Sequence, residues 1–174
     1  MAKSFLGQTG LPVGIQNNNP GNLVKTAIAW EGKIPHAQNT SSRFEQFINI
    51  EYGIRALMRD IITDYSRGLT TVNELINEFA PPHENNTASY VAFVSNAIGI
   101  SSTAQITLTK EALIAICQAI VIMENGQIAR TILSDNDYEN AYKILGKTLP
   151  TAKSGFGFVL PITVLFLISL FAFK

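Results

Sequence analysis

Apolar residues recur at helical spacing through most of the chain between residues 50 and 145. Spacings of three and four residues place such side chains on one face of a helix, while polar caps and glycines mark where each helix begins and ends. On this basis we expect helices over residues 50–65, 71–79, 88–98, 110–124 and 134–145. The first 22 residues are rich in Gly, Asn and Pro, which is typical of a loop.

Residues 25–47 carry a different pattern, because two short apolar runs flank a turn-rich segment. The first run is Ile28-Ala-Trp30, the second is Arg43-Phe-Glu-Gln-Phe47, and residues 31–42 lie between them. This arrangement predicts a small β-hairpin. The fold class that we expect for the first part of the chain is therefore α+β and mainly α.

The last 20 residues are apolar on every side. Residues 155–173 contain no charged side chain, and a helix of that length can span a bilayer. A buried core helix is a poor alternative, since such a helix rarely lacks a polar face. We therefore predict a soluble domain over residues 1–147, a linker over 148–154 and one C-terminal transmembrane helix over 155–173, with the lipid bilayer as a partner.

The charged residues exclude some classes of function. The chain has 13 Lys and Arg against 13 Asp and Glu, so its formal net charge is zero and nothing predicts a nucleic-acid partner. Its single cysteine, Cys117, lies within an apolar helix and provides no disulfide framework. His36 and His83 are far apart in sequence, so we expect neither a metal site nor a cofactor.

Glu124 is the candidate for chemistry. Leu113, Cys117, Ile120 and Glu124 fall on one face of the expected helix, so the acid extends an apolar stripe to the helix end. Partial desolvation and the negative end of the helix dipole both favour its protonated form. A protonated carboxyl group near neutral pH is what a glycosidase uses to protonate a leaving oxygen. The alternative is a frayed helix end with Glu124 in water, as for most lone helical glutamates.

Six motifs follow one another in order: Gly14-Ile-Gln-Asn-Asn-Asn-Pro-Gly-Asn22, Trp30-Glu-Gly32, Arg43-Phe-Glu-Gln-Phe47, Glu51-Tyr-Gly-Ile-Arg-Ala56, Ala80-Pro-Pro-His-Glu-Asn-Asn-Thr87 and Glu124-Asn-Gly126. Together they resemble a family of bacteriophage and prophage virion proteins labelled structural protein P5, whose members are similar to lysozyme-like peptidoglycan-degrading enzymes. The resemblance covers residues 13 to 127. It implies a lysozyme-like domain and a place in the virion.

A looser likeness to bacterial cell-wall glucosaminidases implies roles for single residues. Those enzymes combine an apolar helix ending in Glu with an Asn-rich loop, a Trp and a β-hairpin. On this likeness Glu124 is the general acid. The residues that would wall the sugar cleft are Asn18, Asn19, Asn22, Trp30 and Tyr90, for each of which a turn-forming or core role is the plain alternative.

A second carboxylate is needed by most glycoside hydrolases but not by a lytic transglycosylase, in which a hydroxyl group of the sugar attacks. Glu31 and Glu45, both in the expected hairpin, are the candidates. The sequence leaves open whether the reaction is hydrolysis or transglycosylation.

The function implied is that of a phage virion-associated, membrane-anchored enzyme that cleaves peptidoglycan glycan strands as a lytic transglycosylase, muramidase or glucosaminidase. It would reside in the internal membrane of the virion or in the host inner membrane. The alternative is a non-catalytic structural membrane protein that links the internal membrane to the capsid proteins. An open groove at Glu124 with a second carboxylate or Asn side chains favours catalysis, whereas a salt bridge to Arg55 or Arg130 favours the structural role.

Overall fold

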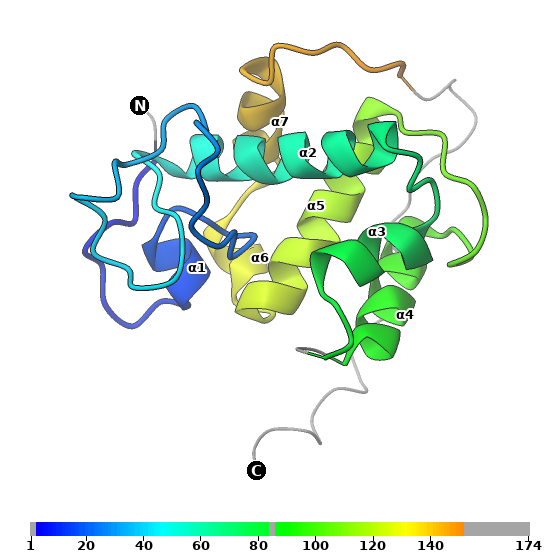
Figure 1. The fold of residues 1–174 in the computed structure, drawn as a ribbon, viewed down its shortest axis with the longest axis horizontal. Helices are drawn as coiled ribbons and strands as arrows, with labels where there is room; N and C mark the ends of the chain where they lie inside the picture. The colour runs from blue at the N-terminus through cyan, green and yellow to red at the C-terminus, as the bar shows by residue number, and fades with distance from the viewer. Residues whose placement is uncertain (1–2, 84–85, 152–174) are drawn as a thin grey trace.

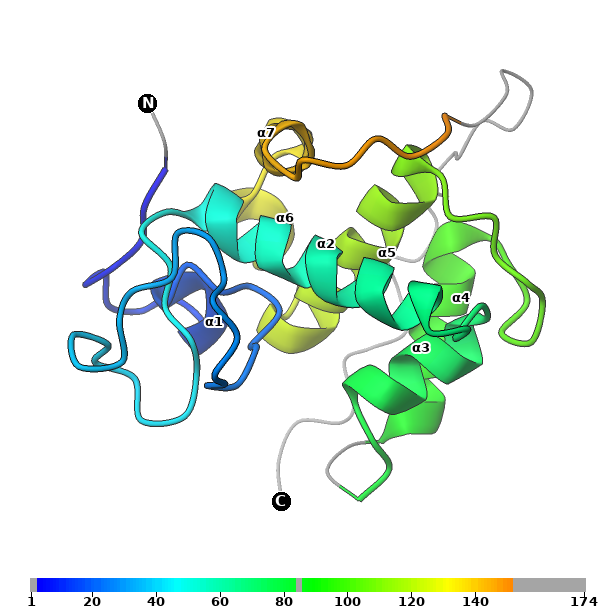
Figure 2. The same cartoon turned by 45° about the horizontal axis from the view of Figure 1, so that its top comes forward.

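Two long helices, α2 (Ile50–Ser66) and α5 (Lys110–Asn125), cross at the centre of the structure, a computed structural model that describes residues 3–83 and 86–151 (Figure 1). The other helices are α1 (Val13–Gln16), α3 (Val72–Phe79), α4 (Thr87–Ile98), α6 (Ala129–Ile132) and α7 (Asp135–Lys143). The long loop between α1 and α2 lies at one end of the crossed pair, and α3 and α4 lie at the other (Figure 2).

The longer helices confirm the pattern of caps read from the sequence. Each begins after a polar residue, namely Asn49, Thr71, Asn86, Thr109 or Ser134. At the start of α3 the Thr71 backbone N–H donates to the Glu74 carboxylate at 3.0 Å, which satisfies a donor that the helix itself leaves free. Gly99 ends α4 in the left-handed conformation with φ of 66°. The short helices α1 and α6 were not expected from the sequence.

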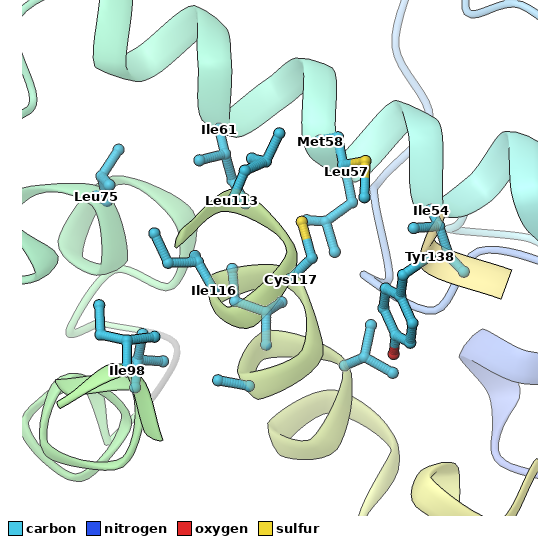
Figure 3. Packing of buried hydrophobic residues seen from close by; sticks show 14 of the residues in the cluster. Ile54, Leu57, Met58, Ile61, Leu75, Ile98, Leu113, Ile116, Cys117 and Tyr138 are labelled. Carbon is cyan, nitrogen blue, oxygen red and sulfur yellow. The ribbon is translucent and has the colours of Figure 1, made fainter. Parts of the chain in front are cut away.

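The core lies between α2 and α5. Leu57 and Ile61 of α2 are buried against the side of α5 that carries Leu113 and Cys117 (Figure 3). Ile116 points toward α3 and α4, so α5 buries apolar side chains on more than one side, as its composition requires. The apolar surface of α5 reaches the turn that carries Glu124.

The predicted β-hairpin over residues 25–47 is wrong. In the described part of the chain, pairing around this segment is limited to two isolated bridges, Val24–Phe44 and Lys33–Phe47. Side chains hold the backbone between them: the buried Glu45 carboxylate accepts the Thr26 N–H at 2.9 Å. Because such side-chain bonds offer the backbone an alternative to a ladder, the segment folds as a loop rather than as two strands.

The predicted fold class also included a C-terminal transmembrane helix, and this part of the prediction is wrong. The predicted single-pass membrane localisation is wrong for the same reason. Across residues 3–83 and 86–151, none of the helices is both long and apolar enough to cross a bilayer. The predicted span over residues 155–173 lies outside the described residues, as do residues 152–154 of the predicted linker over 148–154. The division of the chain at residue 147 stays a prediction.

Gly53 allows the Asn-rich loop to lie directly against α2. A Cβ atom at this position would be 1.7 Å from the Asn18 carbonyl oxygen and 3.1 Å from the Asn19 Cα. Asn18 adopts the left-handed region with φ of 50°, which Asn tolerates better than most residues. Its fully buried side chain accepts the Phe5 N–H and donates to the Phe47 carbonyl. The loop that follows α1 is therefore fixed in place by close packing.

We expect Gly53→Ala to lower the free energy of unfolding by about 2–3 kcal/mol, because the loop backbone must move away from the new methyl group. Helix propensity alone predicts the opposite sign, since Ala in a helix is favoured over Gly by about 0.5–1 kcal/mol. Urea denaturation measures the difference. Thr63→Ala, at an exposed position of the same helix, is the control and should change stability by about 0.5 kcal/mol or less. A stabilised Gly53→Ala protein would contradict the close approach.

Candidate functional site

A cavity of about 760 Å³ lies where the loop over residues 21–30 meets α2, the end of α3 and the end of α5. Its wall includes Asn22, Trp30, Asp60, Asp64, Glu78 and Glu124. Carboxyl groups from three different helices therefore face one space. The volume falls within the range of about 300–1,000 Å³ that small-molecule sites usually have.

Two hydrogen bonds orient the Glu124 side chain, which is half-buried near the end of α5. The Tyr90 hydroxyl of α4 donates to Oε1 at 3.0 Å, and the Asn22 amide donates to Oε2 at 2.9 Å. Burial first, and then the Glu124 carboxylate, raise the pKa of the Tyr90 phenol far above its ordinary value, so Tyr90 keeps its proton and remains a donor. Each carboxylate oxygen is thus held by a separate element of the fold.

Asn125 ties the Asn-rich loop to the helix that carries Glu124. Its side-chain amide donates to the Pro20 carbonyl at 2.6 Å and to the Val121 carbonyl at 2.9 Å. Gly14 leaves room for this contact, because a Cβ there would lie 2.5 Å from the Asn125 Oδ1 and 2.7 Å from the Asn22 Oδ1. The loop is consequently clamped where Asn22 must reach Glu124.

Asp60 of α2 is the second carboxyl group of the cavity. Burial, as the largest cause, and the negative charges of Asp64 and Glu78 together raise its pKa to about 6, although the positive charge of Arg67 opposes them. Arg67 itself pairs with Asp64 at 3.0 Å and with Glu78 at 3.2 Å. No hydrogen bond or ion pair engages the Asp60 side chain among the residues that the structure describes. The cavity thus holds a carboxyl group that keeps its proton up to slightly acidic pH.

The sequence reasoning missed Asp60. It belongs to the polar row of an ordinary amphipathic helix and to none of the six motifs. One signal was available: Asp60 and Asp64 are four residues apart, so two like charges lie one turn apart on one helical face, which is unfavourable without a compensating cation. The cation, Arg67, follows one turn later, and Glu78 comes from another helix.

The structure brings together three of the residues singled out from the sequence. Asn22, Trp30 and Glu124 line the same cavity. The indole N–H of Trp30 is buried and has no hydrogen-bond partner within the described chain. Tyr90 is buried in the core and meets the site only through its hydroxyl group on Glu124, so it positions the acid and does not form the wall.

The other four residues singled out from the sequence lie elsewhere. Asn18 and Asn19 are fully buried and bond to the backbone of their own loop region. Glu31 pairs with Arg55 at 2.5 Å. Glu45 is fully buried and accepts bonds from Lys33 at 3.3 Å and from His36 at 3.0 Å. None of the four lines the Glu124 cavity.

Metal ligands are not gathered at this site. Within residues 3–83 and 86–151, no group of three or more His, Cys, Asp or Glu side chains is arranged to hold a metal ion. The carboxyl groups of the cavity are instead distributed around Arg67, with Asp60 and Glu124 outside its ion pairs.

Comparison with known proteins finds one curated relative. The chain is 34% identical over 119 residues to Protein P5 of Pseudoalteromonas phage PM2, a match that covers 65% of this chain and 71% of that protein. Protein-family models were also compared, and none matches. The expected resemblance to a phage protein labelled P5 is confirmed, whereas no finding supports its extension to lysozyme-like enzymes.

The raised pKa of Asp60 predicts a pH-dependent stability. The folded state binds the Asp60 proton more tightly than the unfolded chain does. Protonated Asp60 therefore contributes its whole stabilising effect below a pH of about 4, and this effect is lost as the pH rises through about 6. We expect Asp60→Asn to be more stable than the wild type at pH 7.5, by on the order of 1–2 kcal/mol. The gain should shrink toward zero at pH 4.

Urea denaturation between pH 4 and pH 8 measures this difference. Asp135→Asn is the matched control, because Asp135 is exposed and does not line the cavity. The control should show no comparable pH-dependent gain. An Asp60→Asn protein with the same stability relative to the wild type at pH 4 and pH 7.5 would contradict the assignment.

Proposed function

We propose, on the premise that this chain belongs to the family of Protein P5 from Pseudoalteromonas phage PM2, that it is a virion protein that cleaves peptidoglycan glycan strands at the Glu124 cavity. The observation that carries the proposal is the setting of Glu124. Its carboxyl group lines an open cavity together with a second carboxyl group, that of Asp60, and the amide of Asn22. Among the described residues no salt bridge engages the Glu124 carboxyl group, and Arg55 pairs with Glu31 instead.

Glu124 would act at the glycosidic oxygen, first as general acid and then as the base that takes the proton back. Tyr90 and Asn22 hold its two oxygens, so the carboxyl group needs little reorientation during the reaction. The phenol of Tyr90 cannot compete for the proton, because its own pKa is raised. The chain thereby supplies a fixed proton-transferring group.

Asp60 supports the chemistry of a hydrolase. Two carboxyl groups whose surroundings differ can divide the roles of acid and base, or of acid and nucleophile, between them. Asp60 is half-buried beside negative charges and has no bonding partner within the described chain, whereas Glu124 is held by two donors. A transglycosylase would need only Glu124, so the contribution of Asp60 separates the two reactions.

The cavity wall suits a sugar ring. Trp30 lines the cavity, and pyranose rings commonly lie against indole faces through their C–H groups. Asn22 also lines the cavity, and its NH₂ group is engaged by Glu124. These two side chains come from one loop, which Asn125 anchors to α5.

A structural role in the virion without turnover is the second candidate. The observation that favours it is the match itself, because the name Protein P5 designates a phage protein and states no enzymatic activity. In that case the domain would hold its place in the virion by contact with capsid proteins, and the carboxyl groups of the cavity would serve only to bind.

Turbidity clearing of purified Gram-negative peptidoglycan by the full chain tests the proposal. We expect the wild type to clear the suspension and Glu124→Gln to lose at least about 100-fold in rate, since the near-isosteric amide cannot transfer the proton. Glu31→Gln is the control, because Glu31 lies outside the cavity and pairs with Arg55. No clearing by a folded wild-type protein would overturn catalysis in favour of the structural role.

Asp60→Asn distinguishes the reactions in the same assay. Loss of activity comparable to that of Glu124→Gln would indicate a two-carboxylate hydrolase, and retained activity with anhydro-sugar products would indicate a lytic transglycosylase. The products are identified by mass spectrometry, since hydrolysis adds a water molecule and transglycosylation does not.

Tyr90→Phe tests whether Tyr90 positions the acid or contacts the sugar. Because its ring is buried and only the hydroxyl group reaches Glu124, we expect kcat to fall roughly tenfold while KM stays unchanged. The lost hydrogen bond should lower stability by about 0.5–1.5 kcal/mol. Steady-state kinetics on soluble glycan fragments gives both constants, and a raised KM at constant kcat would assign Tyr90 to substrate binding instead.

A further inference from the structure

A second and larger groove, of about 900 Å³, lies between α3 and α4 and is closed at one side by residues 99–102. Asn, Ser and Thr side chains supply its polar surface, among them Asn73, Asn77, Ser95, Asn96, Ser101 and Ser102. We propose that this groove is a non-catalytic binding site for a neutral carbohydrate chain. It is separate from the Glu124 cavity, with which it shares no lining residue.

The groove carries no charge on its wall, because none of its lining residues is Asp, Glu, Lys, Arg or His. The Glu124 cavity, in contrast, is lined by carboxylates and arginines. A wall without cations gives a phosphate or another anionic ligand no electrostatic partner. Amide and hydroxyl side chains can both donate and accept hydrogen bonds, and this is the complement that sugar hydroxyl and N-acetyl groups require.

The side chain of Ser95 is a second observation, separate from the uncharged lining of the groove, that points to a ligand. It lies within α4 and is only 9% exposed, and its Oγ is buried without a hydrogen-bond partner in the described chain. Serines inside helices commonly donate to the carbonyl of the preceding turn, as Ser66 of α2 does to Ile62 at 2.7 Å. A buried hydroxyl group without a partner costs free energy. A ligand in the groove could supply that partner after a rotation about the Ser95 Cα–Cβ bond.

Three further polar side chains of the groove are without hydrogen bonds in the described chain. The side chains of Asn96, Ser101 and Ser102 make no hydrogen bond within residues 3–83 and 86–151. Other lining side chains are engaged: the Asn77 amide donates to the Asn73 carbonyl at 2.7 Å and to the Asn73 side chain at 3.3 Å. The Thr87 hydroxyl donates to the Ala80 carbonyl, and the Asn86 side chain accepts the Ser89 N–H. Val91 adds apolar surface beside these groups, which the C–H face of a sugar can cover.

A peptide fits this groove less well. The walls are mainly two helices, whose backbone groups are largely consumed in their own turns, so an extended peptide finds no sheet edge along which to pair. The wall also lacks the aromatic side chains that receive proline-rich segments. A sugar chain needs neither, because its polar groups project sideways and meet side chains.

The inference extends the proposed function without depending on cleavage. α3 separates the two cavities, with Glu78 and Phe79 facing the Glu124 cavity and Asn73 and Asn77 facing the groove. A glycan chain held in the groove would keep the protein on the cell wall whether or not Glu124 transfers a proton. Binding in the groove must therefore survive in the Glu124→Gln protein.

The test uses the full chain with the Glu124→Gln substitution and the tetramer of N-acetylglucosamine as the probe. Titration followed by NMR should shift the backbone amides of Ser95 and Asn96 in a saturable manner. Ala92→Trp, at an exposed lining position of α4, should fill the groove and weaken this binding at least tenfold. Asn136→Trp, an equally exposed change on α7 away from the groove, is the matched control and should leave it unchanged.

Two results would overturn the proposal. One is the absence of shifts at Ser95 and Asn96 at probe concentrations that shift amides around Asn22. The other is the same shift with a neutral peptide of Gly, Ser and Asn and none with the sugar. Saturable shifts that disappear with Ala92→Trp support the groove even where the turbidity assay shows no cleavage, so failure of one proposal is distinguishable from failure of the other.

Discussion

The site depends on the contact between the Asn-rich loop and the end of α5. Asn125 donates to the Pro20 carbonyl, and this bond brings Asn22 within hydrogen-bond distance of Glu124. The contact is possible only because two glycines leave room: Gly14 beside the amide oxygens of Asn22 and Asn125, and Gly53 beneath the Asn18 carbonyl. The Asn-rich loop is held in this way by close backbone packing and not by pairing in a β-sheet. The same packing buries the side-chain amides of Asn18 and Asn19.

The second constraint is electrostatic. Four carboxyl groups surround the Glu124 cavity, and within its wall Arg67 pairs with two of them, Asp64 and Glu78. Asp60 is left beside those charges in a half-buried position, and the outcome is a carboxyl group whose pKa is raised to about 6. A fold optimised only for stability would place an amide or an apolar residue there, since a carboxyl group that loses its proton when half-buried is destabilising at neutral pH. Sites where stability is given up locally are common places for function.

The two cavities on either side of α3 differ in the chemistry that they offer. One is charged and contains an oriented carboxyl group, whereas the other is uncharged and contains a buried hydroxyl group without a partner in the described chain. α4 contributes to both, because Tyr90 reaches Glu124 from one face and Ser95 lines the groove from another. The two proposals therefore rest on separate places in the fold, since the cavities share no lining residue.

The amino-acid sequence alone determined the five longer helices, because caps, glycine stops and apolar spacing are local. It also singled out Glu124 at the end of an apolar helical stripe, and the structure places this residue on a cavity wall. It also determined the relationship to phage Protein P5. It failed for residues 25–47, where long-range side-chain bonds such as those of Glu45 replaced the expected strand pairing. Only the tertiary structure decided that Asp60, rather than Glu31 or Glu45, shares the cavity with Glu124. The crossing of α2 and α5 decides which faces meet, and no pattern within either helix contains that information.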